Sequence, residues 1–130
     1  MDQHNQFGRR GEDLATAFLL SKGLSILDRN WRCGHKELDI VAREGADIVF
    51  VEVKTRRSEE VTSAVEAVTP AKMQRLIHAA EAYIEAHDFE LSPRFDIITL
   101  VGTEPDLHIE HIEDAFHVPI SKTRHRRLLK

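Results

Sequence analysis

Two stretches of the chain repeat apolar residues every three or four positions, the spacing of one face of an α-helix. The first covers residues 8–22 and is followed by Gly23, a residue type that commonly ends a helix. The second begins at Thr69-Pro70, a typical capping pair, and runs to about residue 86. We therefore expect two amphipathic helices, each with one buried face.

Five short runs have the apolar or alternating pattern of β-strands. The predicted strands are residues 24–31, 37–43, 47–54, 95–101 and 107–112. Only Glu44-Gly45-Ala46 separates the second run from the third, which predicts an antiparallel hairpin. The order of helix, three strands, helix and two strands indicates an α/β domain with a mixed central sheet flanked by helices.

The composition is that of one ordinary domain. The chain has 130 residues, of which 42% are hydrophobic and 31% charged. It holds no apolar run of about 18 residues, no apolar signal region at its start, and a single cysteine, Cys33. We expect a single cytoplasmic domain over residues 1–130 that does not enter a membrane. Its core lies at about 7–118, and residues 119–130 form a basic tail that is either a short helix or disordered.

The net charge of −4 is distributed unevenly. Residues 1–75 hold 12 basic and 12 acidic side chains, whereas residues 76–121 hold 10 acidic side chains and one basic residue, Arg94. The last nine residues hold five basic side chains and no acidic ones. A basic surface formed by the first half and the tail is therefore compatible with a nucleic-acid partner. The alternative is that the tail is an ordinary solvated terminus.

Charged residues interrupt both strands of the predicted hairpin, although polar groups are costly to bury without partners. If the turn lies at residues 45–46, the numbers of paired residues sum to 91. Asp39 then lies opposite Glu52, and by the same register Glu37 faces Lys54. Two opposed carboxylates repel each other unless one is protonated or a cation lies between them. The alternative is a cross-strand ladder of salt bridges on a solvated face.

A divalent cation would suit this hairpin. Mg²⁺ prefers carboxylate oxygens, backbone carbonyls and water, and Mn²⁺ accepts the same ligands. Asp39, Glu52 and the backbone carbonyl of Val53 are the candidate ligands. Lys54 shares a strand face with Glu52 and is a candidate to position a water molecule or to stabilise charge on a phosphate. The prediction depends on register, because a slip of one residue would move Asp39 to the opposite face.

The pattern Asp39…Glu52-Val53-Lys54 resembles the D…(D/E)xK signature of restriction-endonuclease-like nucleases. More closely, the chain resembles the YraN family of uncharacterised nuclease-like proteins, which is similar to archaeal Holliday-junction resolvases. The matching segments are FGRRGEDLATAFLLSKGLSILDRNWRC, ELDIVA, IVFVEVKTRR, AVTPAKMQRLIHAA and RFDIITL, within residues 7–101. The resemblance implies a restriction-endonuclease-like αβββαβ core and a metal-dependent phosphodiesterase site, with Asp39, Glu52 and Lys54 as its catalytic residues.

The resemblance also implies that Glu12, on the first helix, completes the metal site. The spacing of Glu12 alone favours the alternative, an acidic residue of the kind common in the first turns of a helix. One departure from the family pattern is Lys36, which stands where a glycine usually precedes the strand of the aspartate.

Five basic residues are candidate contacts to nucleic-acid phosphates, and ordinary solvated charge is their alternative role. They are Arg9, Arg10, Arg56, Arg57 and Lys72. Arg56 and Arg57 directly follow the strand of Glu52, and Lys72 lies near the N-terminus of the second helix.

These features favour an endonuclease that depends on Mg²⁺ or Mn²⁺ and acts on DNA, with branched or structured DNA as a candidate substrate. A homodimer is expected, because cutting a junction requires two active sites. Two alternatives remain, a nucleic-acid-binding module that does not cleave and a protein-interaction scaffold that uses the acidic face. Asp96, next to an apolar strand, is predicted to act as a cap or as a salt-bridge partner.

Overall fold

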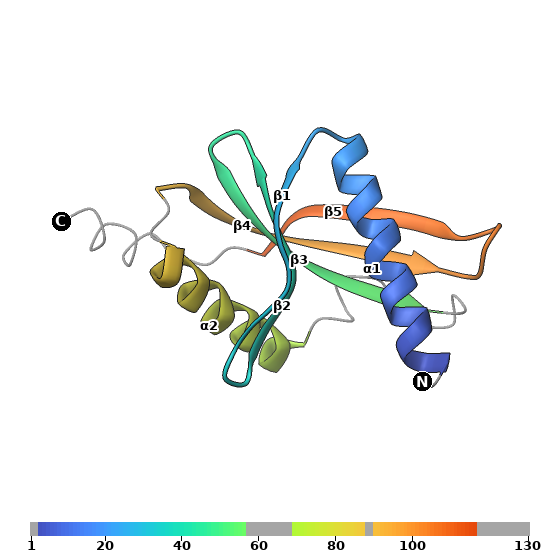
Figure 1. Ribbon diagram of the computed structural model, residues 1–130, viewed down its shortest axis with the longest axis horizontal. Helices are drawn as coiled ribbons and strands as arrows, with labels where there is room; N and C mark the ends of the chain where they lie inside the picture. Colours follow the sequence, from blue (N-terminus) through green and yellow to red (C-terminus); the bar gives the residue numbers. More distant parts are fainter. Residues whose placement is uncertain (1–2, 57–68, 88–89, 117–130) are drawn as a thin grey trace.

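The computed structural model describes residues 3–56, 69–87 and 90–116, with side chains from residue 9 onward. Its elements follow the predicted order of a helix, three strands, a helix and two strands (Figure 1). They are α1 (Gln3–Ser21), β1 (Ser25–Cys33), β2 (Lys36–Glu44), β3 (Asp47–Arg56), α2 (Pro70–His87), β4 (Ser92–Val101) and β5 (His108–Phe116). Arg57 and the predicted tail lie outside the described residues. Within the described part of the chain, no helix is long and apolar enough to cross a membrane.

The five strands form one mixed sheet in the order β1-β2-β3-β4-β5. The pairs β1–β2, β2–β3 and β4–β5 are antiparallel, whereas β3 and β4 are parallel. A parallel pair needs a long crossover connection, and α2 lies in this one. The α/β class, the mixed sheet and the αβββαβ core are therefore confirmed, and β5 extends the sheet beyond that core.

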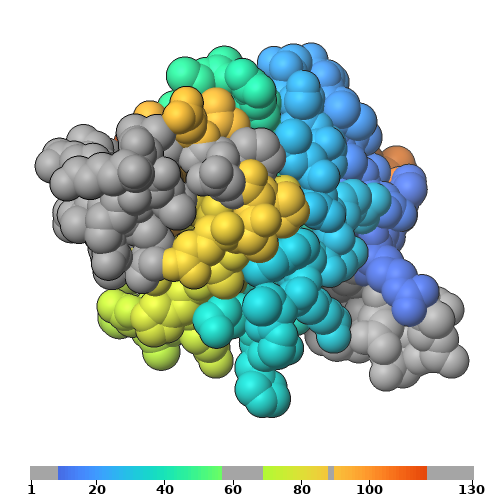
Figure 2. Space-filling view, turned by 60° about the vertical axis from the view of Figure 1, so that its left-hand side comes forward, coloured from blue at the N-terminus to red at the C-terminus, as the bar shows by residue number. Residues whose placement is uncertain are grey.

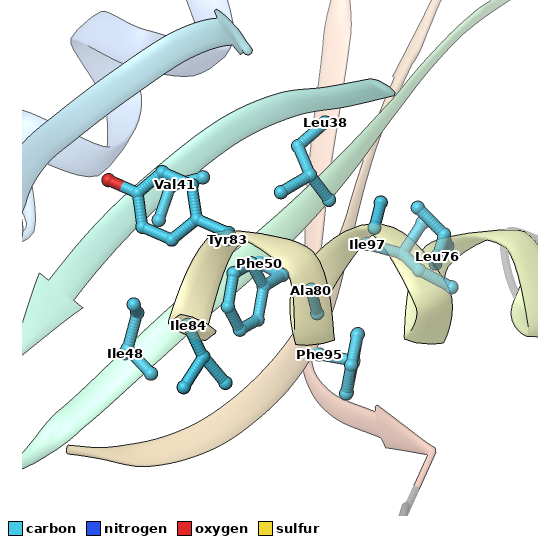
Figure 3. Packing of buried hydrophobic residues seen from close by; sticks show 11 residues of the cluster. Leu38, Val41, Ile48, Phe50, Leu76, Ala80, Tyr83, Ile84, Phe95 and Ile97 are labelled. Carbon is cyan, nitrogen blue, oxygen red and sulfur yellow. The ribbon is translucent and has the colours of Figure 1, made fainter. Parts of the chain in front are cut away.

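The helices cover opposite faces of the sheet, and each helix packs on its own apolar cluster. Leu76, Tyr83 and Ile84 of α2 pack with Phe50 of β3 and Phe95 of β4, as Figure 3 shows. On the other face, Ala15 and Leu19 of α1 join a cluster of β-strand residues that includes Ile98. Because both faces are covered, the central strands β3 and β4 read as nearly continuous apolar runs, and charged residues in them are conspicuous.

The helix ends follow the predicted capping signals. The backbone N–H of Lys72 donates to Thr69 Oγ1 at 3.2 Å, which confirms the N-cap of α2. Gly23 has a φ of +95°, and the amide of Leu24 bonds back to the carbonyl of Leu19 at 3.1 Å, which closes α1. The start of α1 differs from the prediction: the helix begins at Gln3 rather than near residue 8. The early residues are almost all polar, so they leave no apolar stripe to signal a helix.

Candidate functional site

β2 and β3 stop pairing with each other next to two carboxylates, Asp39 of β2 and Glu52 of β3. The β2–β3 ladder runs from Glu44↔Asp47 to Ile40↔Val51, so the predicted register, with paired numbers summing to 91, is confirmed. Beyond it, the backbone N–H of Val53 donates to Asp39 Oδ2 at 2.9 Å. The Asp39 side chain thus accepts the bond that a backbone carbonyl of β2 would otherwise accept.

The end of the ladder corrects one sequence prediction. The same register continued further would pair Asp39 with Glu52 and Glu37 with Lys54, but neither pair belongs to the ladder. Glu37 instead lies 3.6 Å from Arg32 Nη2 of the neighbouring strand. The physical reason is the bond from Val53 to the Asp39 carboxylate, which replaces the backbone pairing that would have carried the register further.

Glu52 is buried under two lysine side chains. Only 5% of the residue is exposed. Its Oε2 lies 3.2 Å from Lys72 Nζ of α2 and 3.7 Å from Lys54 Nζ of its own strand. The shared contact places Glu52 and Lys54 on the sheet face that α2 covers. Because a buried carboxylate is costly without a counter-charge, these ammonium groups compensate Glu52 in the protein alone.

Asp39 is a carboxylate in an unfavourable electrostatic setting. Burial, and then the negative charge of Glu52, raise the pKa of Asp39 from 3.8 to about 7. The hydrogen bond from Val53 and the charge of Lys72 oppose this rise without cancelling it. Near neutral pH the Asp39–Glu52 pair therefore does not carry two full negative charges, and a cation between them would relieve the repulsion.

Glu12 approaches the same region from α1. Its side chain is 20% exposed, and Oε1 lies 3.9 Å from Arg29 Nη2. Burial, and then the negative charge of Asp39, raise the pKa of Glu12. Asp39 of β2 thus interacts electrostatically with Glu12 of α1 and with Glu52 of β3. Within the described residues, however, no three His, Cys, Asp or Glu side chains are close enough together to hold a metal ion.

The backbone of Val53 faces the carboxylates. Its N–H points to Asp39, and residues of a strand direct their N–H and C=O toward the same neighbour. The carbonyl of Val53 is therefore turned to the same side, although its use as a metal ligand stays a prediction.

The predicted phosphate contacts are spread over the molecule. Lys72 lies in the site, on Glu52. Arg56 is half-buried at the end of β3, and Arg9 is exposed on α1. Arg10 forms two hydrogen bonds with Glu104, at 2.9 and 3.0 Å, so its guanidinium already has an anionic partner. No local pattern predicts that pair, because its members are 94 residues apart.

A second buried carboxylate, Asp96 of β4, lies away from this pair. Arg94 donates to both of its oxygens at 2.9 Å, His111 Nε2 donates at 2.8 Å, and the backbone N–H of Asp114 donates at 3.0 Å. Burial alone would raise the pKa of Asp96, but the bonds from His111 and Arg94 outweigh it and lower the pKa. The predicted role of Asp96 as a salt-bridge partner is confirmed.

Comparisons with known proteins agree on one family. The sequence model of the "Uncharacterised protein family UPF0102" matches residues 11–100, a range that holds Glu12, Asp39, Glu52 and Lys72. A UPF0102 protein of Phocaeicola vulgatus is 48% identical over 92% of this chain and 99% of its own length. UPF0102 proteins of Bacteroides thetaiotaomicron (43% identity, 92% and 99%) and Flavobacterium psychrophilum (44%, 90% and 98%) are similar over nearly the same span.

Proposed function

The chain belongs to the UPF0102 (YraN) family, and from its site we propose that it is a metal-dependent nuclease that hydrolyses phosphodiester bonds of DNA. The observation that carries this proposal is the half-buried Asp39 beside the buried Glu52, at the point where the β2–β3 ladder ends. A purely structural pair would gain nothing from a carboxylate whose pKa is raised to about 7.

The donor set fits a hard divalent cation. Asp39 and Glu52 would supply carboxylate oxygens, the Val53 carbonyl would add a ligand from the side of β3 that faces Asp39, and Glu12 interacts electrostatically with Asp39. These are the oxygen ligands that Mg²⁺ and Mn²⁺ take, with water completing the shell. Bound there, the cation would polarise a phosphoryl oxygen and lower the pKa of water.

Two lysine side chains of the protein would then position the attacking water and stabilise the negative charge of the phosphate. Lys54 lies on the same face as Glu52, which supports a role for its ammonium in holding the attacking water and in neutralising charge that develops on the phosphate. Lys72 shares the oxygen of Glu52 with Lys54. Once a cation compensates Glu52, Lys72 is free to pair with a phosphate of the substrate.

One observation favours a second candidate, a nucleic-acid-binding module that does not cleave. Glu52 is already compensated by two ammonium groups, as a structural salt bridge would be. This alternative leaves the raised pKa of Asp39 without a role, which is why we favour the nuclease.

Cleavage assays separate the two candidates. Labelled four-way-junction, duplex and single-stranded DNA would be incubated with the protein in Mg²⁺, in Mn²⁺ and in EDTA. We expect cleavage with either metal, none in EDTA, and a loss of about 10²–10³-fold or more in Asp39→Asn and Glu52→Gln. Asp47→Asn, which changes a partly exposed carboxylate beside Arg94, is the matched control and should cleave normally. Equal cleavage by wild type and Asp39→Asn, or binding of all three DNAs without cleavage of any, would contradict the nuclease.

A further inference from the structure

A polar groove lies between the turn that joins β1 to β2 and the first turns of α2. Its volume is about 400 Å³. His35, Lys36 and Glu37 line the groove from the β1–β2 turn and the start of β2. Lys72, Arg75 and His78 line it from α2. In Figures 1 and 2 the teal hairpin projects beside the yellow-green start of α2. The groove is thus built by two segments that lie more than 30 residues apart in the sequence.

The groove carries two cations, Lys36 and Arg75, beyond those that the described residues pair. Its third cation, Lys72, is paired with Glu52, and its one carboxylate, Glu37, lies 3.6 Å from Arg32. In the described part of the chain, neither Lys36 nor Arg75 has an ion-pair partner. Both residues are exposed. Elsewhere, the cations Arg10, Arg29 and Arg94 are each paired with a carboxylate.

The groove adjoins the carboxylate pair through one shared residue. Lys72 lines the groove and also lies 3.2 Å from Glu52 Oε2. Residues 72, 75 and 78 recur every three positions and therefore lie on one side of α2. They span about 9 Å along the helix, which is the rise of two or three nucleotides of one strand.

We propose that this groove binds the sugar–phosphate backbone of a nucleic-acid strand beside the scissile phosphate, with Lys36 and Arg75 as phosphate contacts. The proposal rests on the proposed function, because it takes the Asp39–Glu52 pair as the place of cleavage. It assigns contacts on the side of the site that β1, β2 and α2 form, away from Arg9 and Arg10 on α1. Phosphate contacts of this kind position a strand without reading its sequence.

Binding in EDTA tests the groove without any cleavage. A fluorescein-labelled 20-nucleotide DNA, single-stranded in one arm and duplex in the other, would be titrated with protein between 50 and 200 mM KCl, and anisotropy followed. The variants are Lys36→Gln, Arg75→Gln and the double substitution. The control is Arg43→Gln, an exposed cation on the same strand as Lys36. It lies seven residues further on, about 23 Å away.

At 0.1 M salt, each lost contact should weaken binding about 5-fold for the single strand and about 8-fold for the duplex. The double variant should lose about 25- to 60-fold, and its log–log salt slope should fall by about 1.4–1.8. Arg43→Gln should stay within about twofold of wild type. The arm with the larger absolute affinity identifies the strand form that the groove accepts.

Two results would overturn the proposal that the groove binds DNA, and a parallel Mn²⁺ titration distinguishes them. In the first result, wild type binds DNA, but Lys36→Gln and Arg75→Gln bind it as tightly as Arg43→Gln does. The assignment of Lys36 and Arg75 as phosphate contacts is then wrong, and the nuclease proposal stands. If wild type binds neither DNA form, the groove fails together with DNA as the ligand. Mn²⁺ bound by wild type and not by Asp39→Asn would then leave a metal site whose substrate lies elsewhere.

Discussion

Asp39 and Asp96 are both carboxylates in the central strands of one sheet, yet their surroundings are opposite. Asp96 is 1% exposed and accepts hydrogen bonds from Arg94, His111 and the backbone of Asp114. Asp39 accepts one bond from the backbone of Val53 and lies against a second carboxylate, Glu52. The pKa is lowered for Asp96 and raised to about 7 for Asp39.

The contrast separates a carboxylate whose charge the protein compensates from one whose charge it does not. The Asp96 cluster is electrostatically satisfied, so its charges stabilise the folded state and leave nothing for a ligand to add. In the Asp39–Glu52 pair, Lys54 and Lys72 compensate Glu52, whereas Asp39 keeps a raised pKa, so a proton or a cation on Asp39 would relieve the remaining repulsion. Burial alone would not have distinguished the two sites, because Asp96 and Glu52 are both among the buried polar residues.

The largest expected effect is on stability. Asp96→Asn should lower the free energy of unfolding by about 3 kcal/mol, because it removes the buried charge that accepts hydrogen bonds from Arg94, His111 and the backbone of Asp114. Asp39→Asn should change it by less than about 1 kcal/mol at pH 7, or raise it, because the amide oxygen still accepts from Val53 and the repulsion is gone. Urea unfolding of wild type and both variants at pH 7 measures these changes in the free energy of unfolding. Equal destabilisation by the two substitutions would contradict the comparison.

The second effect is the sign of the pH dependence in metal-free buffer. A carboxyl whose folded pKa is raised stabilises the fold when protonated, so the contribution of Asp39 is lost as pH rises toward and through 7. A carboxyl whose pKa is lowered, such as Asp96, stabilises the fold above its ordinary pKa of 3.8 and loses this contribution as pH falls.

Between pH 5 and 8, the free energy of unfolding of wild type should therefore fall by on the order of 2 kcal/mol relative to that of Asp39→Asn. Urea midpoints at the two pH values measure it, and Asp47→Asn should follow wild type. A difference between wild type and Asp39→Asn that does not change with pH would show that the pKa of Asp39 is ordinary.

A third effect concerns the ammonium group on Glu52. Lys72→Met removes a cation that lies 3.2 Å from the oxygen a metal ion would bind. Metal affinity should rise about 5- to 10-fold, while Lys72→Arg, which keeps the charge, should stay near wild type. Calorimetric titration with Mn²⁺ gives both affinities. Weaker metal binding in Lys72→Met would mean that Lys72 supports the site rather than competing for it.

The smallest expected effect is that of Arg10. Its guanidinium is held by Glu104, so Arg10→Gln should change DNA affinity by less than about twofold in the anisotropy titration. Glu104→Gln should strengthen binding slightly, because it releases the guanidinium. A loss of fivefold or more in Arg10→Gln would make Arg10 a phosphate contact, as the sequence alone had suggested.

Local patterns predicted most of the fold. Apolar spacing located both helices, Thr69 and Gly23 marked helix ends, and the short turn at residues 44–46 gave the hairpin its register. These signals depend on residues that are close in sequence. The extra length of β4 and β5 was missed, because the register shift near Phe95 and the positive φ of Asp114 have no simple local pattern.

The site was predicted less completely, because its geometry depends on contacts across the chain. Strand alternation placed Glu52 and Lys54 on one face, and the structure bears this out. It could not show that Asp39 bonds to the backbone of Val53, since a strand pattern contains no information on where pairing ends. Nor could it show that Lys72 reaches Glu52 from a helix 20 residues further on.

Calorimetric titration with Mn²⁺ at pH 7.5 tests the central claim most directly, with wild type, Asp39→Asn, Glu52→Gln and the control Asp47→Asn. We expect one ion per chain in wild type and in Asp47→Asn, with no binding heat in Asp39→Asn or Glu52→Gln. Equal binding by wild type and Asp39→Asn, or no binding by folded wild type with and without DNA, would contradict the claim that Asp39 and Glu52 form a metal site.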